Sequence, residues 1–159
     1  MDVITMPSTS PLLNELIRDY PNITFHAGEQ FEWQPNEATV IYDHADPSFD
    51  ARLLHEVGHS RLKHSAYDRD IDLIAMERDA WQDARIQLGP TYGVEITSDA
   101  IDKDMDTYRD WLHERSTCPH CQSSGIQTGK KEYTCVTCRK LWKVNEARTC
   151  SLRRYKHLQ

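Results

Sequence analysis

The sequence lacks long apolar runs, internal repeats and low-complexity tracts. Its longest purely apolar run covers residues 73–76, far short of the roughly 20 residues that a membrane-spanning helix requires. The first residues contain neither a basic region nor an apolar signal core. Cysteine is also scarce, with five residues in 159, all of them after position 117. We therefore expect a cytoplasmic protein without a membrane partner, in a reducing compartment where paired cysteines bind metal more often than they form disulfides.

Charge is unevenly distributed along the chain. Residues 1–117 hold 23 acidic and 10 basic residues, a net charge of -13, whereas residues 118–159 hold 2 acidic and 9 basic residues, a net charge of +7. Hydrophobic residues make up 38% of the chain, which is enough for a modest core and argues against a fully disordered protein. The asymmetry predicts two modules, one over residues 1–116 and one over residues 117–159.

Apolar spacing and turn residues predict an α+β fold for the first module. Strands are expected at residues 23–26, 29–33 and 39–42. Helices are expected at residues 10–20, 46–64, 71–88 and from 98 onward. The helix over 71–88 is expected to stop at Gly89-Pro90, because proline cannot continue a helix that precedes it.

The helix expected at 46–64 contains His55-Glu56-Val57-Gly58-His59, an H-E-x-x-H motif. Two histidines four residues apart lie on one helical face, so both imidazoles can reach one Zn²⁺ ion. Glu56 lies beside them and can accept a proton from the water that such a zinc ion activates. A charged helix with coincidental spacing is the alternative. His64 follows His59 by five residues, so we expect it off the ligand face, at the surface or supporting the site.

A catalytic zinc needs a third protein ligand, and the next helix offers Glu77, Asp79 and Asp83. At 100° per residue from Leu73, Glu77 lies near 40°, inside the apolar stripe of the helix. Asp79 and Asp83 lie well off the stripe, at about -120° and -80°. A carboxylate on the core-facing side is costly unless it is paired or bound to metal. We therefore predict Glu77 as the third ligand, with a buried salt bridge to a nearby arginine as the alternative.

Residues 54–64, followed by Glu77-x-x-Ala80-x-x-x-Ala84, resemble the gluzincin metallopeptidases. The likeness is closest to the minigluzincins and the ImmA/IrrE-like peptidases, and it covers roughly residues 25–111. Trp81 departs from the pattern, because many relatives carry Asp or Asn at this position.

The resemblance implies a zincin-like minimal metallopeptidase domain. In the resembling families the two motif histidines and the glutamate of the second helix bind zinc, which assigns His55, His59 and Glu77, and the motif glutamate, here Glu56, is the catalytic base. The resemblance also implies that the strand at 39–42 is an edge strand that binds an extended substrate by strand addition.

A second ligand set lies in the basic module. Cys118, Cys121, Cys135 and Cys138 form two C-x-x-C pairs, and four thiolates suit a closed tetrahedral zinc site. A module of about 40 residues needs such a metal to fold, so we predict a structural zinc ribbon over residues 117–159. A disulfide framework is the alternative reading. Cys150 is expected to be a lone thiol without function.

The predicted ribbon also carries aromatic residues at Tyr133, Trp142 and Tyr155. Basic charge with exposed aromatics is typical of proteins that bind single-stranded nucleic acid. A peptidase followed by a zinc ribbon is similar in architecture to the SprT-like proteases, which act near DNA, although their third zinc-binding histidine has no counterpart here. The alternatives are that the positive charge keeps the ribbon soluble or docks it on the acidic domain.

Together these patterns predict a peptidase that holds two zinc ions, one catalytic and one structural. The expected substrate is a protein or peptide, and the ribbon would recruit that substrate or nucleic acid. One alternative is a nucleic-acid or protein-binding adaptor, stabilised by zinc, whose peptidase site is inactive. Another is a regulatory peptidase that cleaves a single repressor, as ImmA-like proteins do.

Overall fold

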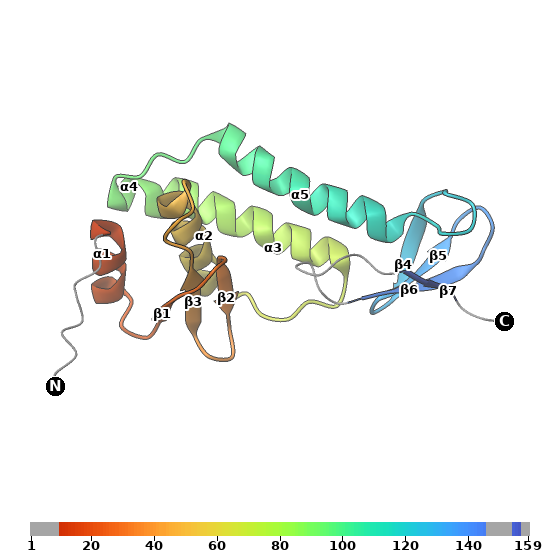
Figure 1. Ribbon diagram of the computed structural model, residues 1–159, viewed down its shortest axis with the longest axis horizontal. Coiled ribbons are helices and arrows are strands. Elements are labelled where there is room, and N and C mark those ends of the chain that lie inside the picture. The colour runs from red at the N-terminus through yellow and green to blue at the C-terminus, as the bar shows by residue number, and fades with distance from the viewer. Residues whose placement is uncertain (1–9, 146–153, 157–159) are drawn as a thin grey trace. The chain divides into compact units, whose positions relative to one another are not determined.

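The computed structural model describes residues 10–145 and 154–156 (Figure 1). The described elements belong to the α+β class that the sequence predicts. They form two compact units, one of Met1–Ser65 with Asp79–Thr97 and one of Ala66–Arg78 with Ser98–Gln159. The units therefore interleave along the chain and do not coincide with the modules 1–116 and 117–159. That residues 1–116 and 117–159 fold as separate domains stays a prediction.

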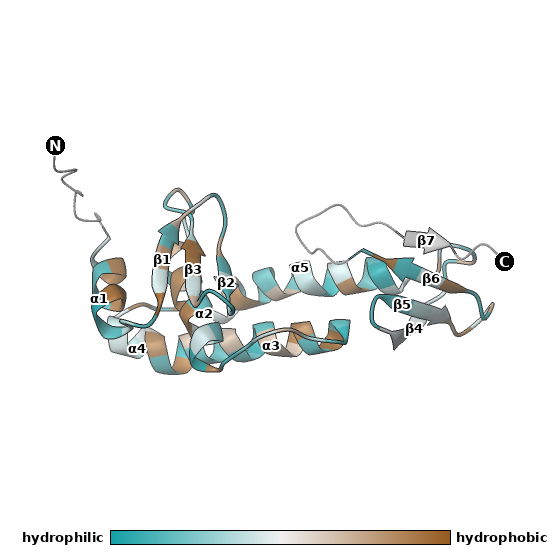
Figure 2. Cartoon of the chain, turned by 90° about the horizontal axis from the view of Figure 1, so that it is seen from below, coloured by the Kyte–Doolittle hydropathy of each residue, from teal (hydrophilic) through white to brown (hydrophobic). Residues whose placement is uncertain are grey.

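The first unit begins with helix α1 (Pro11–Asp19). The Ser10 hydroxyl accepts a hydrogen bond from the Leu13 N–H at 3.2 Å, and Pro11 occupies the first turn, as the Ser-Pro pair predicts. Leu12, Leu13 and Leu16 are buried, whereas the exposed residues are mostly polar, with Ile17 as the exception, so α1 carries both colours in Figure 2.

A small mixed sheet follows α1. Its strands are β1 (Thr24–Ala27), β2 (Glu32–Gln34) and β3 (Thr39–Tyr42), in the order β1-β3-β2. β3 pairs in parallel with β1 and antiparallel with β2, and it buries Val40 and Tyr42. The expectation that residues 39–42 form an edge strand is therefore wrong. Because both sides of β3 are paired, it offers no free backbone groups to a substrate strand.

Four helical segments contribute to the site or flank it. They are α2 (Phe49–Arg61), α3 (Asp70–Asp83), the π-helical segment η1 (Ala84–Leu88) and α4 (Gly89–Tyr92). The predicted stop at Gly89-Pro90 is wrong, because Pro90 lies in the first turn of α4, where its missing N–H costs nothing. Gly93, with φ of 68°, ends α4 in the left-handed conformation. In the part of the chain that the structure describes, no helix combines the length and apolar character of a membrane span.

The second unit combines the first turns of α3 with helix α5 (Ser98–Ser116) and an antiparallel sheet. Its strands, paired in chain order, are β4 (Gly125–Gly129), β5 (Glu132–Cys135), β6 (Leu141–Val144) and β7 (Arg154–Lys156). The small core of this sheet contains Tyr133 and Trp142, whose rings stack with centroids 5.6 Å apart, and Val144. The indole N–H of Trp142 donates to the carbonyl of Arg115 at 2.9 Å, so the sheet is tied to the end of α5.

A buried ion pair joins the elements of the second unit. Arg115 on α5 donates to Asp70, the first residue of α3, at 2.7 Å, and both residues are almost completely buried. The hydroxyl of Tyr133 donates to the same carboxylate at 2.6 Å, and the Gln127 side-chain oxygen accepts from the Asp70 N–H at 2.8 Å. Burial, followed by the hydrogen bond to Asp70, raises the pKa of Tyr133 well above its usual value. These hydrogen bonds provide the buried charges of Asp70 and Arg115 with partners in place of water.

Candidate metal centres

The first candidate centre is built on one face of α2. His55 and His59 are one turn apart and buried, and their Nε2 atoms lie 3.1 Å from each other. At a zinc–nitrogen distance of about 2.0–2.1 Å, two ligands of a tetrahedral ion would be about 3.3 Å apart. The two imidazoles therefore present their nitrogens at nearly the separation that zinc needs.

Glu77 completes the first group. It is buried on α3, one turn before Ala80 and Trp81, and one ligand atom each from Glu77, His55 and His59 all lie within 4.8 Å of one another. The structure therefore brings together the three residues that the sequence proposed as ligands. Asp83 instead receives a hydrogen bond from Arg61 at 2.7 Å.

The close approach of two helices explains a glycine in the motif. A Cβ atom on Gly58 would lie 2.7 Å from the carbonyl oxygen of Ala80 and 3.5 Å from the Ala80 Cα atom. A real Cβ contact of this kind would force the backbone apart. Only glycine at this position lets α2 pack so closely against the turn of α3 that follows Glu77.

Glu56 and Trp81 also lie beside the histidines. The Glu56 carboxylate is buried, and its Oε1 atom lies 4.0 Å from the Nε2 atom of His55. Trp81 stacks on the ring of His55, with centroids 4.2 Å apart and planes inclined by 27°. At the position where the resembling peptidases carry Asp or Asn, this chain thus orients a histidine by ring packing.

The second candidate centre is the four-cysteine group. The Sγ atoms of Cys118 and Cys138 are 3.7 Å apart, and those of Cys121 and Cys135 are 3.5 Å apart. Four thiolates around a tetrahedral zinc ion, with bonds of about 2.3 Å, would be about 3.8 Å apart. A disulfide would need about 2.05 Å, so these four residues fit a metal and not a pair of disulfides. Cys150 lies outside the described residues.

Backbone N–H groups turn toward the sulfur atoms of this centre. His120 N–H points at the Cys118 sulfur at 3.4 Å, and the N–H groups of Thr137 and Cys138 point at the Cys135 sulfur at 3.3 and 3.4 Å. Such hydrogen bonds favour the thiolate form that binds metal. A side-chain hydrogen bond from Ser123 lowers the pKa of Cys121 to about 6.

The aromatic residues of the ribbon do not form the surface that the sequence suggested. Tyr133 and Trp142 are buried in the core of the sheet, so neither ring is exposed to stack on a nucleic-acid base. The side chain of Tyr155 lies outside the described residues. The basic residues Lys130, Arg139, Lys140 and Lys143 are exposed.

One feature of the structure was beyond sequence reasoning, and another was foreseen only in part. The Asp70–Arg115 pair joins residues 45 positions apart, and no local pattern distinguishes them from other charged residues. His64 does reach the first centre, because its Nδ1 atom lies 2.9 Å from the Nδ1 atom of His59. Its five-residue spacing predicted a place off the ligand face, at the surface or supporting the site, and its contact with the second nitrogen of His59 agrees with the supporting position.

Comparisons with protein-family models, curated proteins and solved structures find no match. The likeness to gluzincins therefore remains a resemblance of motifs, and no family is assigned. What remains is the geometry of the chain's own residues, a buried His₂Glu group beside a glutamate and a separate Cys₄ group.

Proposed function

We propose that the chain is a zinc-dependent peptidase that hydrolyses a protein or peptide substrate. One observation carries the proposal: His55, His59 and Glu77 converge within 4.8 Å while buried, and the Glu56 carboxylate lies 4.0 Å from His55. A three-ligand group of this composition leaves a fourth position open, which is typical of catalytic zinc rather than structural zinc. We also propose that the domain that holds this group is zincin-like.

The chemistry divides between the metal and Glu56. A zinc ion held by this group would polarise a peptide carbonyl and lower the pKa of water. The Glu56 carboxylate would accept the proton of the attacking water and return it to the leaving amine. Because Glu56 is buried beside the ligands and not among them, it can hold a proton without giving up a metal bond.

The Cys₄ group would hold the second, structural zinc ion. Four thiolates close the coordination shell, so this site has no open position for a substrate. Such a thiolate site would persist in a reducing compartment, so a cytoplasmic location belongs to this proposal.

The direct test compares the parent chain with Glu56→Gln at equal zinc content. The substrate is a broad library of unstructured peptides, and cleavage is detected as new amino termini by mass spectrometry. We expect the parent to cleave and Glu56→Gln to lose about 10²–10⁴-fold in rate, since a general base contributes about that much. Zinc content should be unchanged, because Glu56 is a base and not a ligand.

One result would contradict this function, and a second would leave two alternatives to be separated. Equal cleavage by the parent and Glu56→Gln would show that the activity does not depend on the proposed base. A zinc-loaded parent that cleaves no peptide of the library would favour the adaptor with an inactive site, or a peptidase restricted to one repressor. A candidate repressor added as a folded protein would then separate these two.

The exposed cations of the ribbon favour a second role, recruitment of nucleic acid. Because Tyr133 and Trp142 are buried, such binding would depend on phosphate contacts and fall steeply with salt. Lys140→Glu with Lys143→Glu in the full chain should then weaken binding to single-stranded DNA and leave hydrolysis unchanged. Lys103→Glu on α5 is the control, because it reverses one charge of the same sign at an exposed helix position outside the ribbon. No binding of DNA or RNA by the parent at low salt would exclude this role.

A further inference from the structure

The ring of His59 has a neighbour at each of its nitrogens. Its Nε2 atom faces the Nε2 atom of His55 at 3.1 Å, inside the candidate metal group. Its Nδ1 atom faces the Nδ1 atom of His64 at 2.9 Å, on the other side of the ring. The His59 and His64 rings are inclined by 65°, with centroids 5.1 Å apart. The same imidazole thus connects the metal group to a residue outside it.

The backbone at the end of α2 brings His64 to this position. α2 ends at Arg61, and Lys63 adopts the left-handed conformation with φ of 56°, which turns the chain back. The His64 N–H donates to the His59 carbonyl at 3.0 Å, and the His64 carbonyl accepts from the Trp33 indole at 3.0 Å. These two backbone contacts hold residue 64 whatever its side chain. On a continuous helix a residue five positions after His59 would point elsewhere, so the contact depends on the turn at Lys63.

The way in which a histidine binds metal determines which ring nitrogens of His59 and His64 carry a proton. A histidine binds metal through the lone pair of a neutral imidazole, so His59 with Nε2 in the metal site carries its proton on Nδ1. That proton can only be donated to the His64 Nδ1 atom 2.9 Å away if this atom is an acceptor. His64 then carries its own proton on Nε2.

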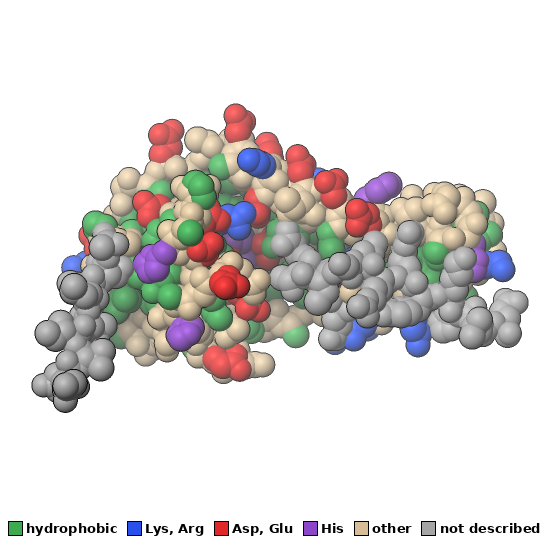
Figure 3. Space-filling model, viewed as in Figure 1, with side chains coloured by type: hydrophobic (Ala, Val, Ile, Leu, Met, Phe, Trp, Pro, Cys, Tyr) green, Lys and Arg blue, Asp and Glu red, His purple; other side chains and the backbone are tan. Residues whose placement is uncertain are grey.

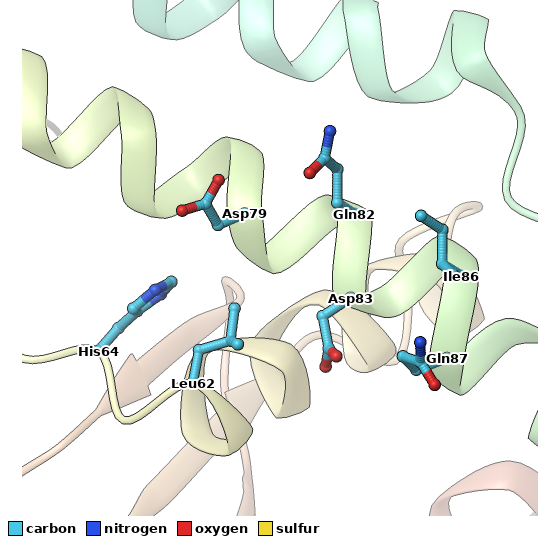
Figure 4. Close-up of a pocket in the computed structure, with 7 residues that line it drawn as sticks. All are labelled: Leu62, His64, Asp79, Gln82, Asp83, Ile86 and Gln87. Atoms are coloured by element: carbon cyan, nitrogen blue, oxygen red, sulfur yellow. The ribbon is translucent and has the colours of Figure 1, made fainter.

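His64 also lines a groove of the first unit. The groove has a volume of about 420 Å³, and its other lining residues are Leu62, Asp79, Gln82, Asp83, Ile86 and Gln87. In Figure 4 the ring of His64, on the loop after α2, and the carboxylate of Asp79, on α3, point toward each other. A carboxylate in this direction suits a proton on the Nε2 atom of His64.

We propose that His64 is a positioning residue that fixes the tautomer and orientation of the zinc ligand His59, with Asp79 in turn facing His64. The proposal rests on the metal site of the proposed function. His64 is not itself a ligand in this arrangement, because its nearest nitrogen meets the side of His59 that faces away from His55. Partners of this kind raise the basicity of a histidine ligand and prevent the ring from turning.

The test compares two substitutions of similar size in the full chain. His64→Asn keeps an acceptor near the Nδ1 position, whereas His64→Leu removes it. Zinc affinity of the first site is measured by competition with a chromophoric chelator, with the Cys₄ zinc retained. We expect His64→Leu to weaken this affinity about 10–100-fold and His64→Asn to recover most of the loss. His26→Leu, on exposed β1, is the control and should leave the affinity unchanged.

A spectroscopic measurement separates positioning from packing. In the zinc-loaded parent with ¹⁵N-labelled histidine, the His59 ring should be protonated at Nδ1, and that proton should exchange slowly with water. His64→Leu should make it exchange rapidly while the backbone spectrum stays unchanged. Equal zinc affinity in all variants would overturn the proposal, and so would equal loss in His64→Asn and His64→Leu.

The outcomes also separate this proposal from the proposed function. A parent that binds zinc through His59 and depends on His64, but cleaves nothing, would sustain the positioning role and refute the peptidase. A parent that cleaves peptides, but whose zinc affinity does not depend on His64, would sustain the peptidase and refute the positioning role. A parent whose His55 and His59 bind no zinc would overturn both.

Discussion

At the scale of single residues, Gly58 sets how closely α2 and α3 can approach. Its missing side chain lets the Ala80 carbonyl oxygen lie where a Cβ atom would be only 2.7 Å away. The neighbour is backbone in the middle of a helix, so it cannot move aside as a flexible side chain would. The separation of the two helices, and with it the position of Glu77 relative to the histidines, depends on this contact.

Gly58→Ala should therefore destabilise the protein, although alanine is the better helix former by about 1 kcal/mol. We expect a net loss of about 1–3 kcal/mol in the free energy of unfolding, as overpacking in a core typically causes. Urea unfolding measures it, with Ser60→Ala on the same helix as a control that should be neutral or slightly stabilising. A variant as stable as the parent would show that the helices are not in such close contact.

The residues of the first centre were predictable because helical geometry is local. Four-residue spacing placed His55 and His59 on one face, and the angular position of Glu77 in the apolar stripe marked it against Asp79 and Asp83. The structure brings those three together, and their role as ligands stays a prediction. His64 was expected off the ligand face, at the surface or supporting the site. Its exact contact with His59 was not predictable, because it depends on where α2 ends and on one left-handed residue after it.

At the scale of elements, the buried pair of Asp70 and Arg115 joins the start of α3 to the end of α5. The hydroxyl of Tyr133 on β5 donates to the same carboxylate, so a strand of the ribbon shares the contact. Because the charges are withdrawn from water, their partners must all be present. Removing one partner would leave an uncompensated charge in the core.

Asp70→Ala should accordingly cost about 3–5 kcal/mol in the free energy of unfolding. The control is Arg109→Met, which breaks the exposed pair of Arg109 with Asp106 and should cost less than about 1 kcal/mol. Chemical unfolding monitored by tryptophan fluorescence reports on both, since Trp142 lies beside the network. If Asp70→Ala were as mild as the control, the network would contribute little to the stability of this unit.

Elements with a regular pattern were predicted well, and their ends and pairings were not. β3 was expected at the residues where it lies, but its central place in the sheet depends on pairing with β1 and β2. The helix expected to stop at Gly89 continues through η1 into α4, since Pro90 falls in a first turn. The burial of the Tyr133 and Trp142 rings was not predicted either, because composition does not say which face of a strand is covered.

At the scale of the whole molecule, charge does not divide as the two compact units do. An exposed acidic stripe runs along α5 and consists of Asp99, Asp102, Asp106, Asp110 and Glu114. Figure 3 shows acidic side chains gathered along the top of the molecule, where α5 lies in Figure 1. The exposed cations of the ribbon belong to the same unit as this stripe. The sign change at residue 117 therefore separates neighbouring elements of one unit, and it predicts surfaces more directly than it predicts domain boundaries.

The central claim is that the chain holds two zinc ions in two separate ligand sets. Elemental analysis of the purified parent after dialysis against a mild chelator should give two zinc ions per chain, and the Cys₄ zinc should resist removal longer. Glu77→Ala should give one, whereas Asp83→Ala, which changes a carboxylate on the same helix that is paired with Arg61, should give two. A parent with a single zinc ion that Glu77→Ala leaves in place would contradict the first centre.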